Sequence, residues 1–339
     1  MTTRKVGLLR ILFIIDPLKK LDKRWDNSLH LLNEMNGRGH ENWAADACDL
    51  RPGKSGGTAL CHQITAKLNP RKRTLSFHTR PSRRFRLEQF DLILIRKEPP
   101  VDAAYFEMLL TLERLAGEVP MVNHPAGIRV TNEKLSILDF QKWIPKTMVS
   151  SSPSALAAFQ KRLKKAVVVK PLDQKGGKGV FLLRFQDAQQ ASRLNRATER
   201  GTRQVMAQEF IRSRKAGEKR IVILNGKVLG AYRKKAKSGE FRANLGLGAS
   251  FHATTLTSRE LKLIAALRPY LLKRGLYLAG IDVLEEKLIE INVTSPAGIT
   301  EIKFLHPQQR PVEAWADFLE RFAAGARGRS LPHSAGRNL

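Results

Sequence analysis

Apolar residues in the first 120 positions form short continuous runs that are separated by helically spaced segments. Asp91-Leu-Ile-Leu-Ile95 is continuous, whereas Leu29, Leu32 and Met35 recur at the spacing of one helix face. The expected elements are a strand at Val6–Ile15, a helix at Asp26–Arg38, a strand at Asp91–Ile95, a helix at Ala103–Ala116 and a strand at Met121–Val122. This alternation predicts an open, parallel, Rossmann-like α/β sheet.

Residues 51–86 interrupt that alternation. They carry no clear strand or helix pattern, and they end in a basic run. The cations of this run are Arg71, Lys72, Arg73, Arg80, Arg83, Arg84 and Arg86. The pattern leaves open whether the run is a docking patch or an ordinary solvated surface.

The remainder of the chain alternates strands with fewer helices, as in α+β folds. The dipeptide Asn225-Gly226 between two strand runs is a strong hairpin signal. Helices are expected at Asn132–Phe140, Asp187–Thr198 and Ser258–Arg274. Strands are expected at Ala166–Val169, Val180–Leu183, Gln204–Phe210, Arg220–Leu224, Lys227–Tyr232, Gly280–Leu284 and Lys287–Val293. The Gly-, Arg- and Ser-rich residues 327–339 are expected to be a disordered tail.

Length and composition narrow the class of protein. The 339 residues predict two or three domains, and the two cysteines, Cys48 and Cys61, are too few for a disulfide framework. The N-terminal apolar run contains Arg10 and lacks a small-residue cleavage site, so it does not resemble a signal peptide. No window approaches the roughly 20 apolar residues of a membrane span. We therefore expect a cytoplasmic protein with no membrane partner.

The net charge of +29 is the unusual bulk property. Such an excess favours anionic partners, which include nucleotides, nucleic acid and acidic proteins. It is equally compatible with a solvated cationic surface.

A predicted hairpin near the C-terminus could hold a metal ion. If its turn is centred on Glu286, Asp282 lies directly opposite Glu290, and Asn292 projects from the same face as Glu290. Opposed carboxylates repel each other unless a cation lies between them, and oxygen-only donors suit Mg²⁺. The alternative is a pair of solvent-facing acids beside lysines such as Lys287.

Two further patterns suggest phosphate binding. The turn from Lys170 to Gly179 contains Gly176, Gly177 and several lysines, and backbone N–H groups in such turns approach phosphate closely. It does not match a P-loop, and it could equally be a plain hairpin tip. Arg220, Arg233 and Arg242, with Asn244 beside the last, could grip phosphate or carboxylate, or could be ordinary exposed arginines.

These segments together resemble the bacterial glutathione synthetases of the ATP-grasp superfamily, from about residue 10 to residue 320. Asp16-Pro17 and Asp26-Asn27-Ser28 fit the family's N-terminal domain. The matching motifs, in order, are Ile95-Arg-Lys-Glu-Pro-Pro100, Asn132-Glu-Lys134, Val169-Lys-Pro-Leu-Asp173 with Gly176-Gly177, Met206-Ala-Gln-Glu209, Gly217-Glu-Lys-Arg220 and Glu290-Ile-Asn-Val-Thr-Ser-Pro296.

The resemblance implies an ATP-grasp fold behind an N-terminal pre-ATP-grasp α/β domain. The implied division is 1–123 for the N-terminal domain, 124–203 for the subdomain with the glycine-rich loop, and 204–326 for the subdomain with the lid and the Mg²⁺ site. It also implies a ligase that uses ATP and Mg²⁺, with Mn²⁺ as a substitute, to join γ-glutamylcysteine to glycine through an acyl phosphate. Members often form homodimers or homotetramers.

Site residues follow from the same resemblance. Those implied to bind ATP are Lys134, Lys170, Asp173, Gly176, Gly177, Gln208, Glu209, Phe210, Ile211 and Glu218. Those implied to bind the metal are Asp282, Glu290 and Asn292, and those implied in catalysis are Arg220, Arg242 and Asn244. Those implied to meet the substrates are Asp26, Ser28, Arg96, Arg233, Ser295 and Pro296.

The chain departs from the family pattern near the substrates. The lid segment Leu245–Phe251 lacks the usual arginine, and Thr300 stands where an arginine commonly precedes Glu301. Two alternatives therefore stay open at this point. One is a related ATP-grasp ligase that adds an amino acid to another peptide or to a protein tail, and the other is an inactive ATP-grasp protein that binds nucleic acid.

Overall fold

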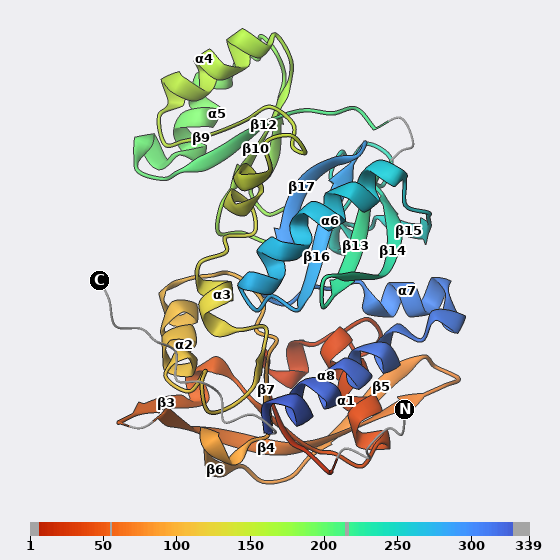
Figure 1. The fold of residues 1–339 in the computed structure, drawn as a ribbon. Helices are drawn as coiled ribbons and strands as arrows, with labels where there is room; N and C mark the ends of the chain where they lie inside the picture. Colours follow the sequence, from red (N-terminus) through yellow and green to blue (C-terminus); the bar gives the residue numbers. More distant parts are fainter. Residues whose placement is uncertain (1–6, 55, 214–216, 328–339) are drawn as a thin grey trace.

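The computed structural model describes residues 7–54, 56–213 and 217–327 and contains three sheets (Figure 1). The first sheet has the strand order β3-β4-β2-β1-β7-β8. Its parallel core consists of β1 (Arg10–Ile14), β2 (Glu41–Ala45), β7 (Leu92–Ile95) and β8 (Met121–Val122). Helices α1 (Asn27–Gly37), α2 (Ala103–Glu113) and α3 (Pro125–Arg129) accompany these strands. The strands predicted here are confirmed, because continuous apolar runs suit a sheet that is buried on both faces.

The prediction of an entirely parallel first sheet is wrong. Residues 51–86, which showed no clear pattern, form antiparallel strands that extend the sheet beyond β2. These strands are β3 (Leu50–Gly53), β4 (Gly56–Asn69), β5 (Thr74–Thr79) and β6 (Arg83–Arg86). The alternation along β4 changes phase, since Ala59 and Cys61 are buried at one end and Ile64 and Ala66 at the other. Such a change of phase hides the period-2 pattern from sequence analysis.

The second and third sheets are antiparallel. The second, in the order β11-β10-β12-β9, contains β9 (Thr147–Ser150), β10 (Val167–Pro171), β11 (Phe181–Leu183) and β12 (Val205–Glu209), with α4 (Pro153–Leu163) and α5 (Gln190–Ala197). The third, in the order β15-β14-β13-β16-β17, contains β13 (Glu218–Leu224), β14 (Lys227–Lys235), β15 (Ser250–Ala253), β16 (Leu278–Leu284) and β17 (Lys287–Asn292), with α6 (Ser258–Lys273). The helix predicted at Asn132–Phe140 is only a 3₁₀ helix, Leu135–Phe140.

The chain returns to the first sheet at its C-terminal end, through α7 (Ile299–Leu305) and α8 (Pro311–Arg327). Figure 1 shows α8 lying beside α1. The Arg38 guanidinium lies 2.7 Å from Asp317 and 3.0 Å from Glu320, and Trp315 is fully buried against the same core. The division at 1–123, 124–203 and 204–326 therefore remains a proposal, with α8 covering the first of these units.

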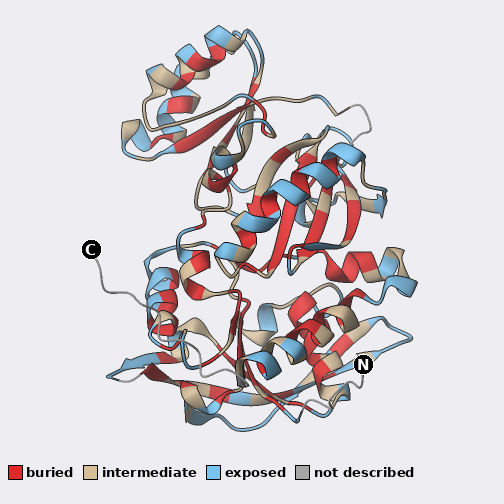
Figure 2. Cartoon of the chain, viewed as in Figure 1, coloured by how far each residue is buried: buried red, intermediate tan, exposed pale blue. Residues whose placement is uncertain are grey.

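Burial follows the sheets (Figure 2): the strands are buried along their middle, and the outer helix faces are exposed. In the described residues, no helix is both long and apolar enough to cross a bilayer. The predicted tail falls outside the described residues from residue 328 onward.

Candidate active site

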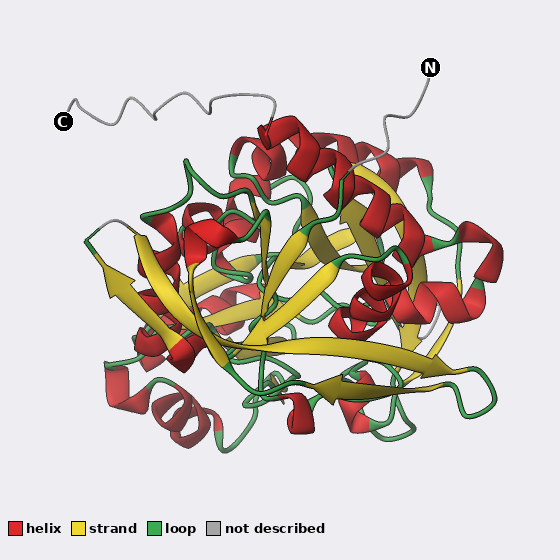
Figure 3. Ribbon diagram, turned by 90° about the horizontal axis from the view of Figure 1, so that it is seen from below, coloured by secondary structure: helices red, strands yellow, loops and turns green. Residues whose placement is uncertain are grey.

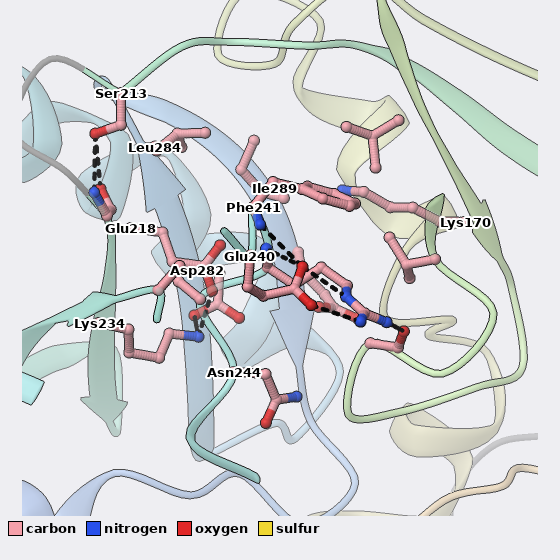
Figure 4. Close-up of a pocket in the computed structure, with 18 of the residues that line it drawn as sticks. Lys170, Ser213, Glu218, Lys234, Glu240, Phe241, Asn244, Asp282, Leu284 and Ile289 are labelled. Atoms are coloured by element: carbon pink, nitrogen blue, oxygen red, sulfur yellow. Dashed lines mark hydrogen bonds and ion pairs between the residues drawn. The ribbon is translucent and has the colours of Figure 1, made fainter. Parts of the chain in front are cut away.

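A cavity of about 490 Å³ lies between the second and third sheets (Figure 4). Strands β13, β16 and β17 form one wall, and the glycine loop with β10 and β12 forms another. Residues 236–244, which directly precede the predicted lid segment Leu245–Phe251, cover the cavity, and we call residues 236–244 the lid. The predicted site residues that line it are Lys134, Lys170, Gly176, Gly177, Gln208, Glu209, Phe210, Ile211, Glu218, Arg220, Arg242, Asn244, Asp282, Glu290 and Asn292. Residues from Glu133 to Asn292, far apart in the sequence, thus meet in one place.

A row of charged side chains crosses one face of the third sheet. Register pairing sets Glu290 opposite Asp282, and Asp282 opposite Arg220. Arg220 donates two hydrogen bonds to Asp282, with Nε 2.8 Å from Oδ1 and Nη2 2.9 Å from Oδ2. Lys234 Nζ lies 3.0 Å from Asp282 Oδ1 and 2.5 Å from Glu218 Oε1. The buried carboxylate of Asp282 and the half-buried carboxylate of Glu218 therefore each lie against a cation.

The cations of this row determine the protonation state of Asp282, which lies at its centre. Burial would by itself raise the pKa of Asp282, but the Arg220 and Lys234 cations outweigh it and hold the pKa well below its ordinary value. Burial raises the pKa of Glu218, and the Lys234 cation opposes that rise. Asp282 is consequently an anion at neutral pH.

A β-bulge decides which side chains of β16 and β17 face the cavity. The β16–β17 turn is Glu285-Glu286, both at positive φ, with Leu284 opposite Lys287. The turn is therefore not centred on Glu286, and a regular ladder from it would set Asp282 opposite Ile289. One extra residue on β17 shifts the register, so the predicted pairing of Asp282 with Glu290 is confirmed.

Two lysines approach the acidic wall from other elements. Lys170 extends from β10, and its Nζ donates to Gln208 Oε1 at 2.9 Å. Lys134 Nζ donates to the carbonyl of Gln174 at 2.7 Å and lies 3.1 Å from Glu290 Oε1. Burial lowers the pKa of Lys170, although the nearby Glu290 carboxylate raises it. These two cations can attract the phosphates of a nucleotide.

An apolar slot lies beside these lysines where the chain passes from the second sheet to the third. Val168, Phe210, Ile211, Leu284 and Ile289 line it. Such a slot suits a planar aromatic base, since ligand pockets are mostly apolar with a few polar groups for orientation.

The glycine loop and the lid contact each other across the cavity. Gly176 and Gly177 have φ of +66° and +75°, a region that favours glycine. Arg242 Nη1 donates to the carbonyl of Gly177 at 3.1 Å, and Glu240 accepts from Arg242 Nε at 3.0 Å and from Nη2 at 2.7 Å. Hydrogen bonds to Arg242 lower the pKa of Glu240 to about 2. Arg242 therefore bridges the lid and the loop.

A second group of predicted residues gathers at the start of α1. Arg96 Nε donates to Ser28 Oγ at 3.1 Å, and Arg96 Nη2 donates to the carbonyl of Pro296 at 3.2 Å. Asp26 caps α1, and burial raises its pKa while the charge of Arg96 lowers it. The segment after Pro296 also contacts Arg220, whose Nη1 donates to the carbonyl of Ala297 at 3.2 Å. This segment, preceded by Ser295, therefore connects the group to the charged row.

Two predicted residues lie away from the large cavity. Asp173 borders a smaller cavity of about 50 Å³ and lies 2.5 Å from Arg203. Arg233 projects from the other face of β14, where its guanidinium reaches the carbonyl of Gly217 and the hydroxyl of Thr254.

Sequence reasoning missed Lys234 and Glu240 as site residues. A regular hairpin at Asn225-Gly226 would set Glu218 opposite Arg233. The bulge between Val222 and Ile223 sets it opposite Lys234 instead. The sequence shows three lysines here, Lys234, Lys235 and Lys237, but it does not show their register.

Two family models match the chain. The model "Prokaryotic glutathione synthetase, N-terminal domain" matches residues 9–129, and "Prokaryotic glutathione synthetase, ATP-grasp domain" matches residues 133–307. The chain belongs to the prokaryotic glutathione synthetase family. It is an ATP-grasp ligase of the kind that forms a C–N bond.

Curated relatives extend over nearly the whole chain. The glutathione synthetase of Synechococcus elongatus is 34% identical over 305 residues, covering 88% of this chain and 94% of that protein. The glutathione synthetase of Gloeobacter violaceus is 37% identical over 303 residues, covering 88% of this chain and 92% of that protein. Among solved structures, D-cycloserine synthetase DcsG has a TM-score of 0.62 at 17% identity, covering 91% of this chain and 99% of that one, which supports the fold.

The charged row has the donor chemistry for a magnesium ion in this glutathione synthetase family member. Among the described residues, no three acidic, histidine or cysteine side chains cluster as a metal site. The predicted set instead combines the carboxylates of Asp282 and Glu290 with the amide oxygen of Asn292, whose Nδ2 donates to the carbonyl of Gly280 at 3.0 Å. These are hard oxygen donors, and the Asp282 carboxylate is ionised, so the set fits Mg²⁺ or Mn²⁺.

Proposed function

We propose that this cavity joins γ-glutamylcysteine to glycine at the expense of ATP, with the charged row and the two lysines as its working parts. The observation that carries the proposal is the Glu290–Asp282–Arg220 row facing Lys134 and Lys170 in one cavity. Family membership supplies the choice of substrates.

A carboxylate does not react directly with an amine, because its leaving group would be oxide. The reaction must first convert it to an acyl phosphate, whose leaving group is phosphate. A carboxylate oxygen attacks the γ-phosphorus of ATP, the bond to the bridging oxygen breaks, and ADP leaves. An amine nitrogen then attacks the carbonyl carbon of the acyl phosphate, phosphate leaves with the electrons of the C–O bond, and the nitrogen loses a proton. The products are the peptide, ADP and phosphate.

The chain's residues bind and orient the reacting groups. We assign Lys134 and Lys170 to the phosphates of ATP, and the slot at Phe210 and Ile211 to its base. Asp282, Glu290 and Asn292 would hold Mg²⁺, which when bound neutralises phosphate charge. Arg220 and Arg242 would bind oxygens of the transferred phosphoryl group, a role in which arginine forks are effective.

The substrates belong on the side of Arg96. We propose that the group formed by Asp26, Ser28, Arg96 and the Ser295-Pro296 turn positions the peptide, with Asn244 at the lid side. Thr300 donates through its backbone N–H and its hydroxyl to Asn27 Oδ1, at 3.0 and 3.2 Å. The small threonine therefore joins this wall by holding the start of α1.

The test is a turnover assay with Mg-ATP, γ-glutamylcysteine and glycine, in which ADP and product mass are measured together. We expect glutathione only when both substrates are present, and a loss of about 10²-fold or more in kcat for Glu290→Ala. The matched control is Glu118→Ala, an exposed acid outside the cavity, which should retain activity. ADP release that needs neither substrate, or product from other acceptors alone, would contradict the proposal.

A further inference from the structure

The outer strands of the first sheet carry many cations and no acids. From Arg51 to Leu87 the sequence contains neither Asp nor Glu. The cationic side chains of this stretch, all exposed, are Arg51, Lys54, Lys67, Arg71, Lys72, Arg73, Arg80, Arg83, Arg84 and Arg86. We call this surface, formed by β3, β4, β5 and β6, the basic sheet. It lies along the base of the molecule in Figure 1, and Figure 3 views the molecule from that side.

Register concentrates three arginines at one end of the basic sheet. Arg51 of β3 and Arg86 of β6 both pair with Thr58 of β4, which lies between them. The two arginines are therefore in one cross-strand row. Arg84, two residues before Arg86, shares their face and donates to Thr58 Oγ1 at 3.3 Å. Like charges placed together on a sheet face destabilise it, so this arrangement does not serve the fold.

The protein itself hardly compensates this charge. Among the ten cations, and counting only partners in the described part of the chain, Arg86 alone has an acidic partner: its Nε lies 3.6 Å from Glu88 with 70% of the side chain exposed. Such a pair contributes little stabilisation. The surface therefore leaves most of its positive charge available to an external anion.

The extent of the surface indicates a polymeric anion. The 14-residue strand β4 spans roughly 46 Å at the usual rise of a strand, so one phosphate could meet only a fraction of the cations. Seven of the ten cations are arginines, whose forks grip phosphate oxygens in pairs.

Few exposed apolar groups accompany these cations, and this selects among polymeric anions; one of them is the ring of Phe304, whose centroid lies 5.3 Å from the Arg73 guanidinium. None of the large hydrophobic side chains that are exposed in the described residues falls between Arg51 and Arg86. Protein interfaces commonly have an apolar core, amphipathic segments bind membranes through residues that insert, and single-stranded nucleic acid is commonly bound by stacking on aromatic rings. Contacts to the backbone of a duplex need none of these.

We propose that the basic sheet binds the phosphodiester backbone of duplex nucleic acid without regard to sequence. This site is separate from the cavity, because none of its ten cations lines it. The proposal does not depend on the ligase activity.

The test measures binding of the full chain to a fluorescent 25-base-pair DNA duplex of arbitrary sequence, by anisotropy at several salt concentrations. The variant is Arg51→Gln/Arg84→Gln/Arg86→Gln. The control is Arg162→Gln/Arg196→Gln/Lys262→Gln, three exposed cations on other elements, which removes the same charge. We expect the variant to bind at least tenfold more weakly and its log–log salt slope to fall by about two to three, with ATP turnover unchanged.

Three outcomes would overturn the proposal. The control could weaken binding as much as the variant, which would mean that overall charge and not this surface attracts the duplex. Vesicles of phosphatidylglycerol and phosphatidylcholine, or polyglutamate, could bind where the duplex does not, which would assign the surface to a membrane or an acidic protein. Absence of salt-sensitive duplex binding would leave the basic sheet without this function. An RNA duplex of the same length tests whether the basic sheet binds the backbone of RNA as well as that of DNA.

Discussion

Asp282 lies directly opposite Glu290, although the two-residue turn that joins their strands would by itself set Asp282 opposite Ile289. The bulge that corrects the register brings two carboxylates together on the cavity wall. Opposed carboxylates are unfavourable alone, yet Arg220 and Lys234 hold Asp282 from one side and Lys134 holds Glu290 from the other. The repulsion is thus offset by three cations that line the same cavity.

Lys234 and Arg233 provide a test of register. We expect Lys234→Gln to lower kcat/KM by about 10-fold or more, because it removes a charged hydrogen bond from Asp282 and Glu218. Arg233→Gln removes the neighbouring cation on the opposite face and should stay within about threefold of the parent. The measurement is the kcat/KM of both variants by steady-state kinetics. A larger loss for Arg233→Gln would mean that the sequence-based assignment of Arg233 to the substrate was right.

Asp282 should make stability depend on pH at the acid end. Its pKa in the folded protein lies below the ordinary value of 3.8, so its contribution is fully present above 3.8 and is lost as pH falls through the folded pKa. The unfolding free energy of the parent should therefore decline more steeply below pH 3.8 than that of Asp282→Asn, as measured by urea denaturation between pH 3 and pH 7. Parallel declines would show that the ion pairs do not couple to folding.

Glu240 should act by positioning Arg242. Glu240→Gln keeps the shape but removes the charge that orients the guanidinium toward Gly177, so we expect kcat to fall about three- to tenfold while the KM for the peptide changes little. The control is Glu199→Gln, an exposed acid that pairs with the half-buried Arg203 outside the large cavity. An effect confined to KM would indicate that Glu240 instead meets a substrate.

Gly177 tests the glycine loop. An alanine there would adopt φ near +75°, at a cost of about 1–2 kcal/mol, and its Cβ would lie 3.4 Å from Arg242 Cδ. We expect Gly177→Ala to weaken ATP binding several-fold in a calorimetric titration. Gly117→Ala, where nothing lies within 4 Å of the added Cβ, should bind ATP like the parent. Equal affinities in both variants would place the phosphates elsewhere.

The sequence by itself determined the family and most of the strands. Continuous apolar runs such as Leu92–Ile95 and turn dipeptides such as Asn225-Gly226 are local signals, and local chemistry was enough to interpret them. The order of motifs likewise indicated the residues that line the cavity, because a motif carries its chemistry in consecutive positions.

The tertiary structure decided what depends on registers and distant contacts. A bulge adds one residue without a distinctive sequence, so only the folded sheet shows that Lys234 and not Arg233 faces Glu218. Residues 51–86 form strands whose apolar pattern changes phase, and α8 packs on α1 across more than 270 positions, as the Arg38–Asp317 pair shows. Such contacts form between segments that are distant in the sequence. The local sequence of one segment does not indicate which distant surface it will be buried against.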